Sequence, residues 1–275
     1  HHQKKHDQPF FLWLNLSLPH GPLDVAQPYH APYATKQFQK VIPAGDVSDL
    51  PSELVASKYK QNKSVLDNQR QFAACVAFID MLVGKLVDCL QRQEIRDDTM
   101  IVFFSDHGIM LADHGLSGKG TLFKEVLNPS LIISWPAASR RGVVETRPVE
   151  LLDILKTSLQ IAGASRSDID RPFGESLLPL LTGEGEYRRQ ACFAEMTGFY
   201  AVVTREYKYI NNFDYQENKS GPVLFDLKND PDETRNVADN HRDVITTMRS
   251  MANDWMKATQ PVRPPYFYSK KNRAR

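Results

Sequence analysis

The apolar residues of the chain fall into runs and periodic patterns that predict alternating strands and helices. An apolar run at Pro9–Leu18 is typical of a central strand that is buried on both faces of a sheet. Apolar residues then recur every three or four positions over residues 66–91, which predicts one long amphipathic helix. A second apolar run, Met100–Phe104, predicts the next strand. This order of strand, loop, helix and strand is typical of α/β proteins.

The second half of the chain continues this pattern and then changes character. A strand is predicted at residues 129–135 and a helix at 149–162, where Gly163 suits a C-terminal cap. The polar, glycine-bearing stretch Gly183–Arg189 predicts a boundary, so we expect an α/β part at residues 1–186 and a small α+β subdomain at 187–275. The elements expected in that subdomain are strands at 191–195, 200–204, 208–210 and 223–226 and a closing helix at 244–256.

Candidate chemistry lies at the end of the second predicted strand. Asp106 and His107 follow that strand, and ligands in open α/β sheets bind outside the carboxyl ends of strands. A carboxylate and an imidazole can bind a divalent cation, and Lys119, between two glycines, can hold a tetrahedral anion. His20 follows the first apolar run, at the same edge of a parallel sheet, and can bind an ester oxygen or protonate a leaving group. Together they predict a metal-assisted site for a sulfate or phosphate ester.

Each of these residues also has a purely structural interpretation. Asp106 can cap a turn, His107 can be a satisfied, partly buried imidazole, and Lys119 can be a solvated loop residue. The strand before Asp106 and the lysine after it favour the site. His20 fits an ordinary loop between prolines equally well. His114 repeats the Asp-His-Gly triplet, but no strand precedes it, and we interpret it as loop architecture.

Composition and charge narrow the class of protein. With 275 residues and 41% hydrophobic residues, the chain can form a core. Its net charge of +1 gives no argument for a nucleic-acid partner, and no apolar run is long enough to predict a membrane span. Cys75, Cys89 and Cys192 do not form a metal or redox spacing, so we expect buried free thiols.

Taken together, eight ordered blocks of the sequence resemble the C-terminal portion of a type I sulfatase, in the alkaline-phosphatase superfamily. They include TMIVFFSDHG at Thr99–Gly108, ADHGLSGKGTLFKE at Ala112–Glu125 and LFDLKNDPDETRNVAD at Leu224–Asp239. The other five blocks lie at residues 9–22, 129–136, 147–155, 174–184 and 204–210. The match covers nearly the whole chain, and eight blocks in order are far more specific than any single motif.

The resemblance implies a fold and a chemistry. The fold would be α/β, the C-terminal part of an alkaline-phosphatase-like sandwich with a large, mixed, mostly parallel sheet, plus the small α+β subdomain. Sulfatases hydrolyse sulfate esters with a formylglycine made from Cys or Ser and a divalent cation, usually Ca²⁺; Mg²⁺, Mn²⁺ and Zn²⁺ stay open here. By resemblance, Asp106 and His107 match one pair of cation ligands, although many members carry Asn at the position of His107. Lys119 matches the lysine that holds the sulfate and its bridging oxygen, and His20 a histidine near the leaving group.

One part of the family pattern is absent from this sequence. The nucleophile motif is Cys/Ser-x-Pro-x-Arg, and none of the three cysteines has a proline two positions later. We therefore expect a fragment that is completed by an N-terminal segment of the same protein, which would carry the formylglycine. A phosphate or phosphonate ester hydrolase of the same superfamily and an inactive remnant or binding protein are the alternatives. A sulfated small molecule or glycan is the expected substrate, the family is often periplasmic, secreted or lysosomal, and the oligomeric state stays open.

Overall fold

A computed structural model describes most of the chain, and the chain forms two compact units. The first unit combines residues 1–39 with 61–96, and the second combines residues 40–60 with 97–275. The boundary expected after residue 186 falls inside the second unit and stays a prediction. The described residues are 9–38, 41–43, 45, 50–52, 54–55, 64–138, 140–165, 174–196, 198–212 and 221–259.

The first unit is built on the long helix α2, Val65–Arg92, which confirms the helix predicted at 66–91. Ser64 caps it, because its hydroxyl accepts a hydrogen bond from the backbone N–H of Asp67 at 3.2 Å. The short helices α1, Gln27–His30, and η2, Ala31–Tyr33, contact α2, and the ring of Tyr29 packs edge-on against Phe78. The amphipathic pattern of the sequence therefore becomes a helix with one packed face.

The apolar run at Pro9–Leu18 is not a strand. The structure assigns no strand to residues 9–17, and the side chains stay open, with Phe11 76% and Leu12 61% exposed. The prediction of a central strand here is wrong for this chain. A strand needs a neighbouring backbone to satisfy its N–H and C=O groups, and an apolar composition alone does not supply one.

The second unit begins with a two-stranded antiparallel sheet. Strand β1, Ile101–Phe104, pairs with β4, Leu131–Ser134, and both strands agree with the predicted ones. Alternate residues of β4 face the cluster formed by Leu177, Leu180 and Tyr187. Helix α4, Leu152–Ile161, and helix α6, Leu178–Thr182, belong to the same part of the unit.

Between β1 and β4 the chain forms a small hairpin and one turn of helix. Strand β2, Met110–Leu111, pairs with β3, Ser117–Gly118, and the 3₁₀ turn η3, Asp113–Gly115, connects them. Helix α3, Lys124–Leu127, follows the hairpin and leads toward β4. Every residue of the motif between Asp106 and Lys119 therefore lies on or next to this hairpin.

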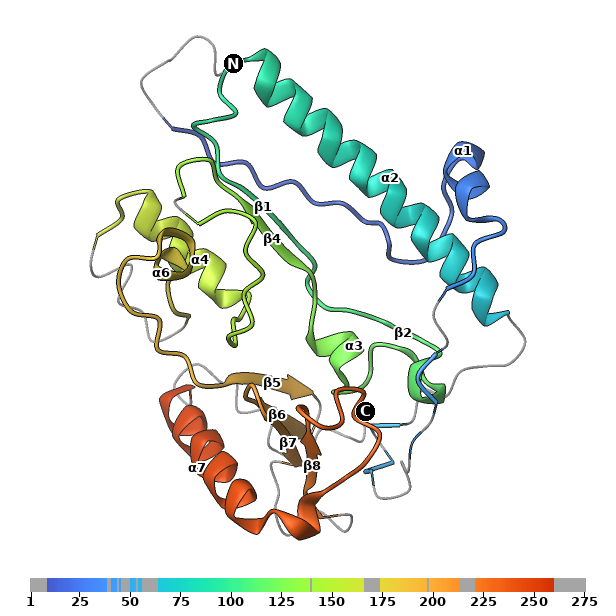
Figure 1. The fold of residues 1–275 in the computed structure, drawn as a ribbon, viewed down its shortest axis with the longest axis vertical. Coiled ribbons are helices and arrows are strands. Elements are labelled where there is room, and N and C mark those ends of the chain that lie inside the picture. Colours follow the sequence, from blue (N-terminus) through green and yellow to red (C-terminus); the bar gives the residue numbers. More distant parts are fainter. Residues whose placement is uncertain are drawn as a thin grey trace, which may run out of the picture. The chain divides into compact units, whose positions relative to one another are not determined.

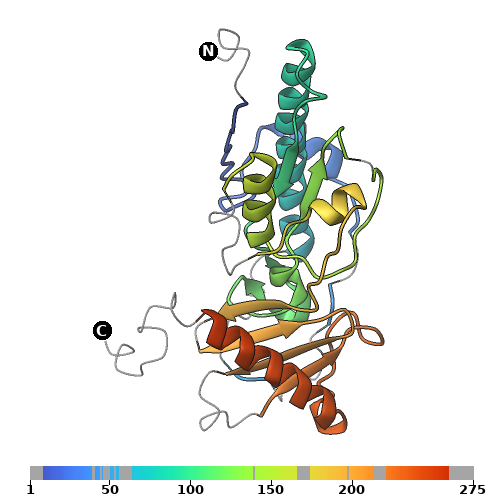
Figure 2. The same cartoon turned by 90° about the vertical axis from the view of Figure 1, so that its left-hand side faces the viewer.

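The remainder of the second unit is a four-stranded antiparallel sheet in the order β5-β6-β7-β8 with helix α7 on one face (Figures 1 and 2). This arrangement confirms the predicted α+β character of this part of the chain. The strands are β5, Cys192–Met196, β6, Phe199–Val203, β7, Tyr207–Asn212, and β8, Val223–Asp226, and the helices are η4, Ala238–Asn240, and α7, Arg242–Thr259.

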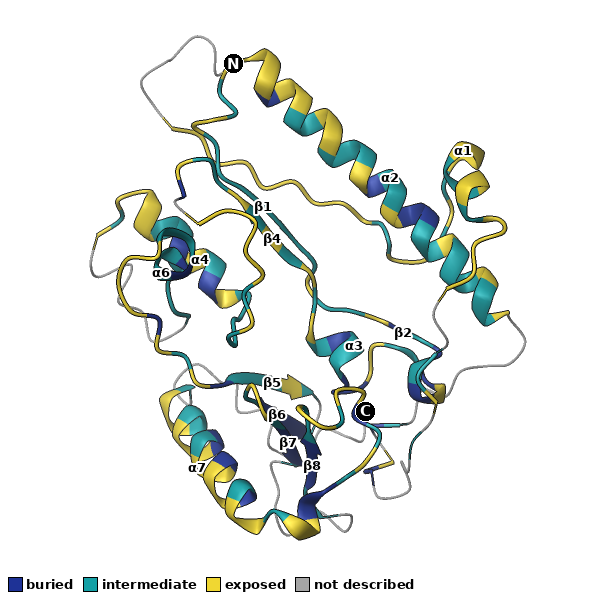
Figure 3. Ribbon diagram, viewed as in Figure 1, coloured by how far each residue is buried: buried dark blue, intermediate teal, exposed yellow. Residues whose placement is uncertain are grey.

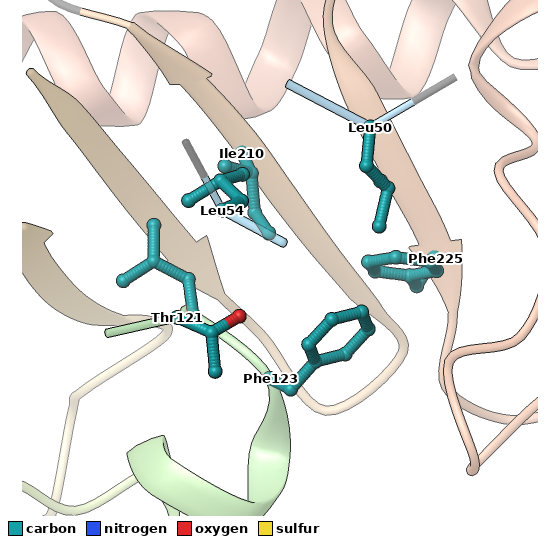
Figure 4. Close-up of a pocket in the computed structure, with 7 residues that line it drawn as sticks. Leu50, Leu54, Thr121, Phe123, Ile210 and Phe225 are labelled. Atoms are coloured by element: carbon teal, nitrogen blue, oxygen red, sulfur yellow. The ribbon is translucent and has the colours of Figure 1, made fainter. Parts of the chain in front are cut away.

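This sheet is buried on both faces (Figure 3). Tyr200, Val202 and Tyr209 face the cluster that contains α7, whereas Ile210 and Phe225 face the opposite side. There Ile210 and Phe225 pack with Leu50, Leu54, Leu122 and Phe123 (Figure 4), and these side chains leave no space for a water molecule. The side-chain alternation of each strand thus fills two separate cores.

Candidate active site

Strand β1 ends at Phe104, two residues before the first candidate cation ligand, Asp106. The backbone N–H of Ser105 still donates to the carbonyl of Ser130, at 3.1 Å, and this bond continues the pairing with the segment before β4. The Ser105 hydroxyl then donates to the carbonyl of His107, at 2.7 Å, and so closes a tight turn. Asp106 projects from this turn with its side chain 81% exposed. The loop therefore presents a carboxylate to solvent at the end of a strand, as the sequence predicts.

The hydrogen bonds of His107 define its tautomer. Its Nδ1 lies 2.8 Å from the carbonyl oxygen of Gly108, which can only accept, so Nδ1 carries the proton. In the neutral ring the lone pair is then on Nε2, which lies 3.4 Å from Oδ2 of Asp106. An Nδ1–H···O=C bond is the usual way to orient a metal-binding histidine. One nitrogen and one oxygen donor side by side fit part of a divalent-cation site.

Lys119 follows β3 directly and reaches back to the same nitrogen. Its ammonium group lies 3.0 Å from Nε2 of His107, and an ammonium group can only donate. The single lone pair on Nε2 therefore serves either Lys119 or a cation, not both. A cation on His107 would leave the Lys119 ammonium free to donate to an anion. The structure thus brings together three of the four residues predicted from sequence.

Gly108 packs so closely on helix α3 that no other residue fits there. A Cβ atom on Gly108 would lie 1.8 Å from the carbonyl oxygen of Glu125, far inside contact distance. The N–H of Gly108 donates to the carbonyl of Val126, at 2.9 Å. The Asp106–His107 turn is therefore attached to α3 through the glycine that ends its motif.

A buried ion pair holds α3 against the four-stranded sheet. Lys208, on β7, pairs with Glu233, and both side chains are almost fully buried. The Lys208 ammonium also donates to the carbonyl of Leu122, and Glu233 accepts from the backbone N–H of Lys124. The segment that carries α3 is thus fixed by charge-assisted hydrogen bonds from the C-terminal sheet. No sequence motif predicts this pair, because the two residues lie in different sequence blocks.

His20 lies in the first unit, in the loop after the extended apolar segment. Its Nδ1 is 3.0 Å from the carbonyl oxygen of Gly21, and its ring is exposed. The structure describes the surroundings of His20 only within the first unit, and the role of His20 at the site stays a prediction. Among the described residues, no group of three or more His, Cys, Asp or Glu could hold a metal ion. Asp106 and His107 alone thus supply only part of a coordination sphere.

The sequence matches a known family model along most of its length. A model described as Sulfatase matches residues 2–164. The chain belongs to the sulfatase family. A second model, described as the C-terminal region of N-sulphoglucosamine sulphohydrolase, matches residues 112–258. The resemblance deduced from the eight sequence blocks is thereby confirmed.

Curated sulfatases of bacteria are similar to this chain. A sulfatase of Formosa agariphila is 27% identical over 98% of the chain and 55% of its own length. The choline-sulfatase of Rhizobium meliloti is 32% identical over 66% of the chain and 35% of its own length. The chain therefore spans about half, or less, of these two sulfatases.

Solved structures support the same fold. A Bacteroides fragilis protein assigned as the sulfatase yidJ has a TM-score of 0.77, at 24% identity, over 96% of this chain and 57% of its own. BT4656, solved with its substrate D-glucosamine-2-N,6-O-disulfate, has a TM-score of 0.61 at 25% identity over 73% of this chain and 42% of its own. These neighbours confirm an α/β fold of the alkaline-phosphatase type. No helix in the described part of the chain is long and apolar enough to cross a membrane.

Proposed function

We propose that the chain is the C-terminal part of a sulfuric-ester hydrolase that uses a divalent cation and a formylglycine nucleophile. The observation that carries the proposal is the convergence of Asp106, His107 and Lys119 at the end of β1, with Lys119 3.0 Å from His107. A cation donor pair next to an ammonium group suits an ester with a charged tetrahedral centre. Family membership supports the sulfate ester as the substrate class.

Each residue has a proposed role. Asp106 and His107 supply one oxygen and one nitrogen ligand for the cation. The family resemblance favours Ca²⁺, with Mg²⁺, Mn²⁺ and Zn²⁺ as alternatives. The bound cation would neutralise charge on the sulfate oxygens. Lys119 donates hydrogen bonds to the sulfate and its bridging oxygen, and His20 stabilises or protonates the leaving group. These roles for His20 and Lys119 follow the family resemblance.

The nucleophile and the remaining ligands are proposed to come from an N-terminal segment of the same protein. The chain spans only 55% of the length of the Formosa sulfatase, and its cysteines do not match the nucleophile motif. The apolar run at residues 9–17 and Ile132, which is 62% exposed, offer apolar surface for such a segment. The family is often found in the periplasm, in lysosomes or outside cells, and we expect one of these locations.

A sulfated glycan or small molecule is the proposed substrate. The neighbour BT4656 binds a disulfated glucosamine, and an N-acetylglucosamine-6-O-sulfatase of Bacteroides thetaiotaomicron is 29% identical over 78% of the chain. A second candidate is phosphonate ester hydrolysis. The phosphonate monoester hydrolase of Silicibacter pomeroyi shares the fold, with a TM-score of 0.70 at 23% identity. Asp106, His107 and Lys119 by themselves suit either ester.

The deciding experiment compares esters on the protein that contains this chain together with its nucleophile segment. Intact mass and N-terminal sequencing first identify the purified species. Initial rates are then measured with 4-nitrophenyl sulfate, 4-nitrophenyl phosphate and a phenyl phosphonate monoester, with and without a chelator. We expect the sulfate ester to give the highest kcat/KM and chelation to abolish it. Faster turnover of the phosphonate would transfer the proposal to the second candidate. No turnover, with an unchanged melting temperature on chelation, would indicate a binding protein or remnant.

A further inference from the structure

His114 is a buried histidine in a backbone conformation that few residues adopt. Its φ and ψ are 53° and 19°, in the turn η3 between the two strands of the hairpin. The side chain is wholly buried, and its ring stacks on Phe123 with centroids 4.0 Å apart and planes 14° apart. A left-handed conformation costs a residue with a Cβ about 1–2 kcal/mol, so it persists only where the surroundings fix it. The tight stack on Phe123 is such a restraint.

The two ring nitrogens of His114 have no hydrogen-bond partner among the described residues. The same is true of Oε2 of Glu125, which lies 3.7 Å from His114 Nε2. Burial lowers the pKa of His114 and raises the pKa of Glu125, so both side chains are driven toward their neutral forms. Buried polar groups without partners cost about 1–3 kcal/mol each, so stability alone does not account for this pair.

The position of the pair points to another role. His114 lies on the hairpin whose second strand leads directly into Lys119. Glu125 lies on α3, and its backbone carbonyl contacts Gly108, whose own carbonyl orients His107. The contact between His114 and Glu125 therefore joins the element that carries Lys119 to the element that holds His107.

Two further hydrogen bonds fix the other side of this turn. The backbone N–H of His114 donates to the carbonyl of Ile42, at 2.8 Å. The Asp113 carboxylate accepts from the N–H of Ile42, also at 2.8 Å. The tip of the hairpin is thus clamped between residue 42 and α3. Lys119 directly follows β3, so a shift of the tip would reach Lys119 through that one short strand.

We propose that His114 and Glu125 are positioning residues that act as a pair to hold Lys119 beside the turn that carries Asp106 and His107. The inference deepens the proposed function, and it rests on that function only for the use that catalysis makes of Lys119. The pairing itself concerns contacts within this chain. A purely structural role would instead lower stability and leave the surroundings of Lys119 unchanged in any variant that folds.

The test is the nuclear magnetic resonance signal of Lys119 in the full 275-residue chain. Lysines are dimethylated with ¹³C-labelled formaldehyde, and the Lys119 signal is identified by its absence in Lys119→Arg. In His114→Asn and Glu125→Ala we expect this signal to move to the position of a solvent-exposed lysine such as Lys257, whose side chain is 78% exposed. Asn tolerates the left-handed backbone, so the first change removes the imidazole with little strain. Far-UV circular dichroism confirms that each variant folds.

A conservative variant and a double variant separate positioning from packing. Glu125→Gln keeps the size and shape of the side chain and is expected to retain the wild-type signal. His114→Asn combined with Glu125→Ala should move the signal no further than either change alone, because the two residues act as one unit. His241→Asn, the same substitution elsewhere in the second unit, is the matched control and should leave the signal in place.

A wild-type Lys119 signal in folded His114→Asn or Glu125→Ala would overturn the proposal. So would an equal displacement in the His241→Asn control. If His114→Asn does not fold, the contrast between Glu125→Ala and Glu125→Gln decides alone. The experiment does not involve turnover, so failure of sulfate-ester hydrolysis and failure of the positioning pair give separate results.

Discussion

The two sheets of the second unit contrast in how completely this chain buries them. In the sheet β5–β8, Tyr200, Val202 and Tyr209 are fully buried, because α7 covers one face and a second core covers the other. In the two-stranded sheet formed by β1 and β4, one face of β4 packs on the cluster around Leu180, whereas Ile132 is 62% exposed. Both sheets have strongly apolar strands. The difference shows that an apolar sequence favours a strand, whereas the number of elements packed against that strand decides whether its side chains are buried.

Their polar groups follow the same contrast. Lys208, on β7 of the four-stranded sheet, and Glu233 are buried and paired with each other. Asp106 and Lys119, near the two-stranded sheet of β1 and β4, are exposed. A buried charge must be paired, whereas an exposed charge is solvated by water and stays accessible to a ligand. Stability is therefore expected to depend on the first region and ligand binding on the second.

The strongest test of this contrast is removal of the buried ammonium. We expect Lys208→Ala to lower the free energy of unfolding by about 3–5 kcal/mol, because Glu233 is left buried without its partner. Urea unfolding followed by circular dichroism measures it. The control is Lys257→Ala, which breaks an exposed pair with Asp254 and should cost less than about 1 kcal/mol. Similar losses for the two variants would contradict the contrast.

A matched pair of apolar truncations tests the two sheets directly. Phe225→Ala, at a side chain only 2% exposed, is expected to cost about 3–5 kcal/mol. Ile132→Ala, at a side chain 62% exposed, is expected to stay within about 0.5 kcal/mol. Both values come from urea unfolding of the same 275-residue chain. A large loss for Ile132→Ala would mean that β4 is already part of a core.

Replacement of Lys119 tests the exposed region by its effect on catalytic activity. In the protein that carries the nucleophile, Lys119→Ala is expected to lower kcat/KM for an aryl sulfate by about 10²–10³-fold, the usual cost of one charge-stabilising donor. Initial rates with 4-nitrophenyl sulfate measure the loss, and an unchanged melting temperature excludes unfolding. Full activity in Lys119→Ala would remove this residue from the proposed mechanism.

Replacement of Asp106 tests cation binding, and its expected effect is smaller than that of Lys119→Ala. Asp106→Asn removes the anionic oxygen beside Nε2 of His107, so the affinity for Ca²⁺ should fall by more than about tenfold. Isothermal titration calorimetry on the complete protein measures the affinity. Asp254→Asn, on α7, keeps the same change in charge away from the site and should leave the affinity unchanged. Equal affinities in Asp106→Asn and the wild type would argue against this ligand.

The smallest expected effect is a pH dependence at Glu145. Its hydrogen bonds with Arg147 lower its pKa from 4.5 to about 2. A carboxyl group whose pKa is lowered by folding stabilises the protein above its unfolded pKa, and this contribution is lost as the pH falls from 4.5 through about 2. Glu145→Gln should therefore flatten the stability profile in this window and leave its slope near pH 7 unchanged. Urea midpoints from pH 2 to pH 7 measure it, and parallel profiles would contradict the prediction.

Local patterns in the sequence were sufficient for most elements. The helix predicted at 66–91 is α2, Val65–Arg92, because a long amphipathic period encodes its own buried face. The short strands of the C-terminal sheet were also predicted from their residue patterns. The run at Pro9–Leu18 does not form the predicted strand, because composition alone does not specify whether a pairing partner is present. The candidate site was predicted through Asp106, His107 and Lys119, which one sequence block contains.

The sequence by itself determined most of the longer helices and strands, membership of the sulfatase family and the three clustered residues of the candidate site, because all of these are encoded in local periodicity and in contiguous motifs. Only the tertiary structure decided that Lys208 meets Glu233, that Gly108 packs on α3 and that His114 faces Glu125. Such pairings depend on how separate elements approach one another in space. Burial and the satisfaction of buried polar groups select them, and neither is expressed in any single stretch of the chain.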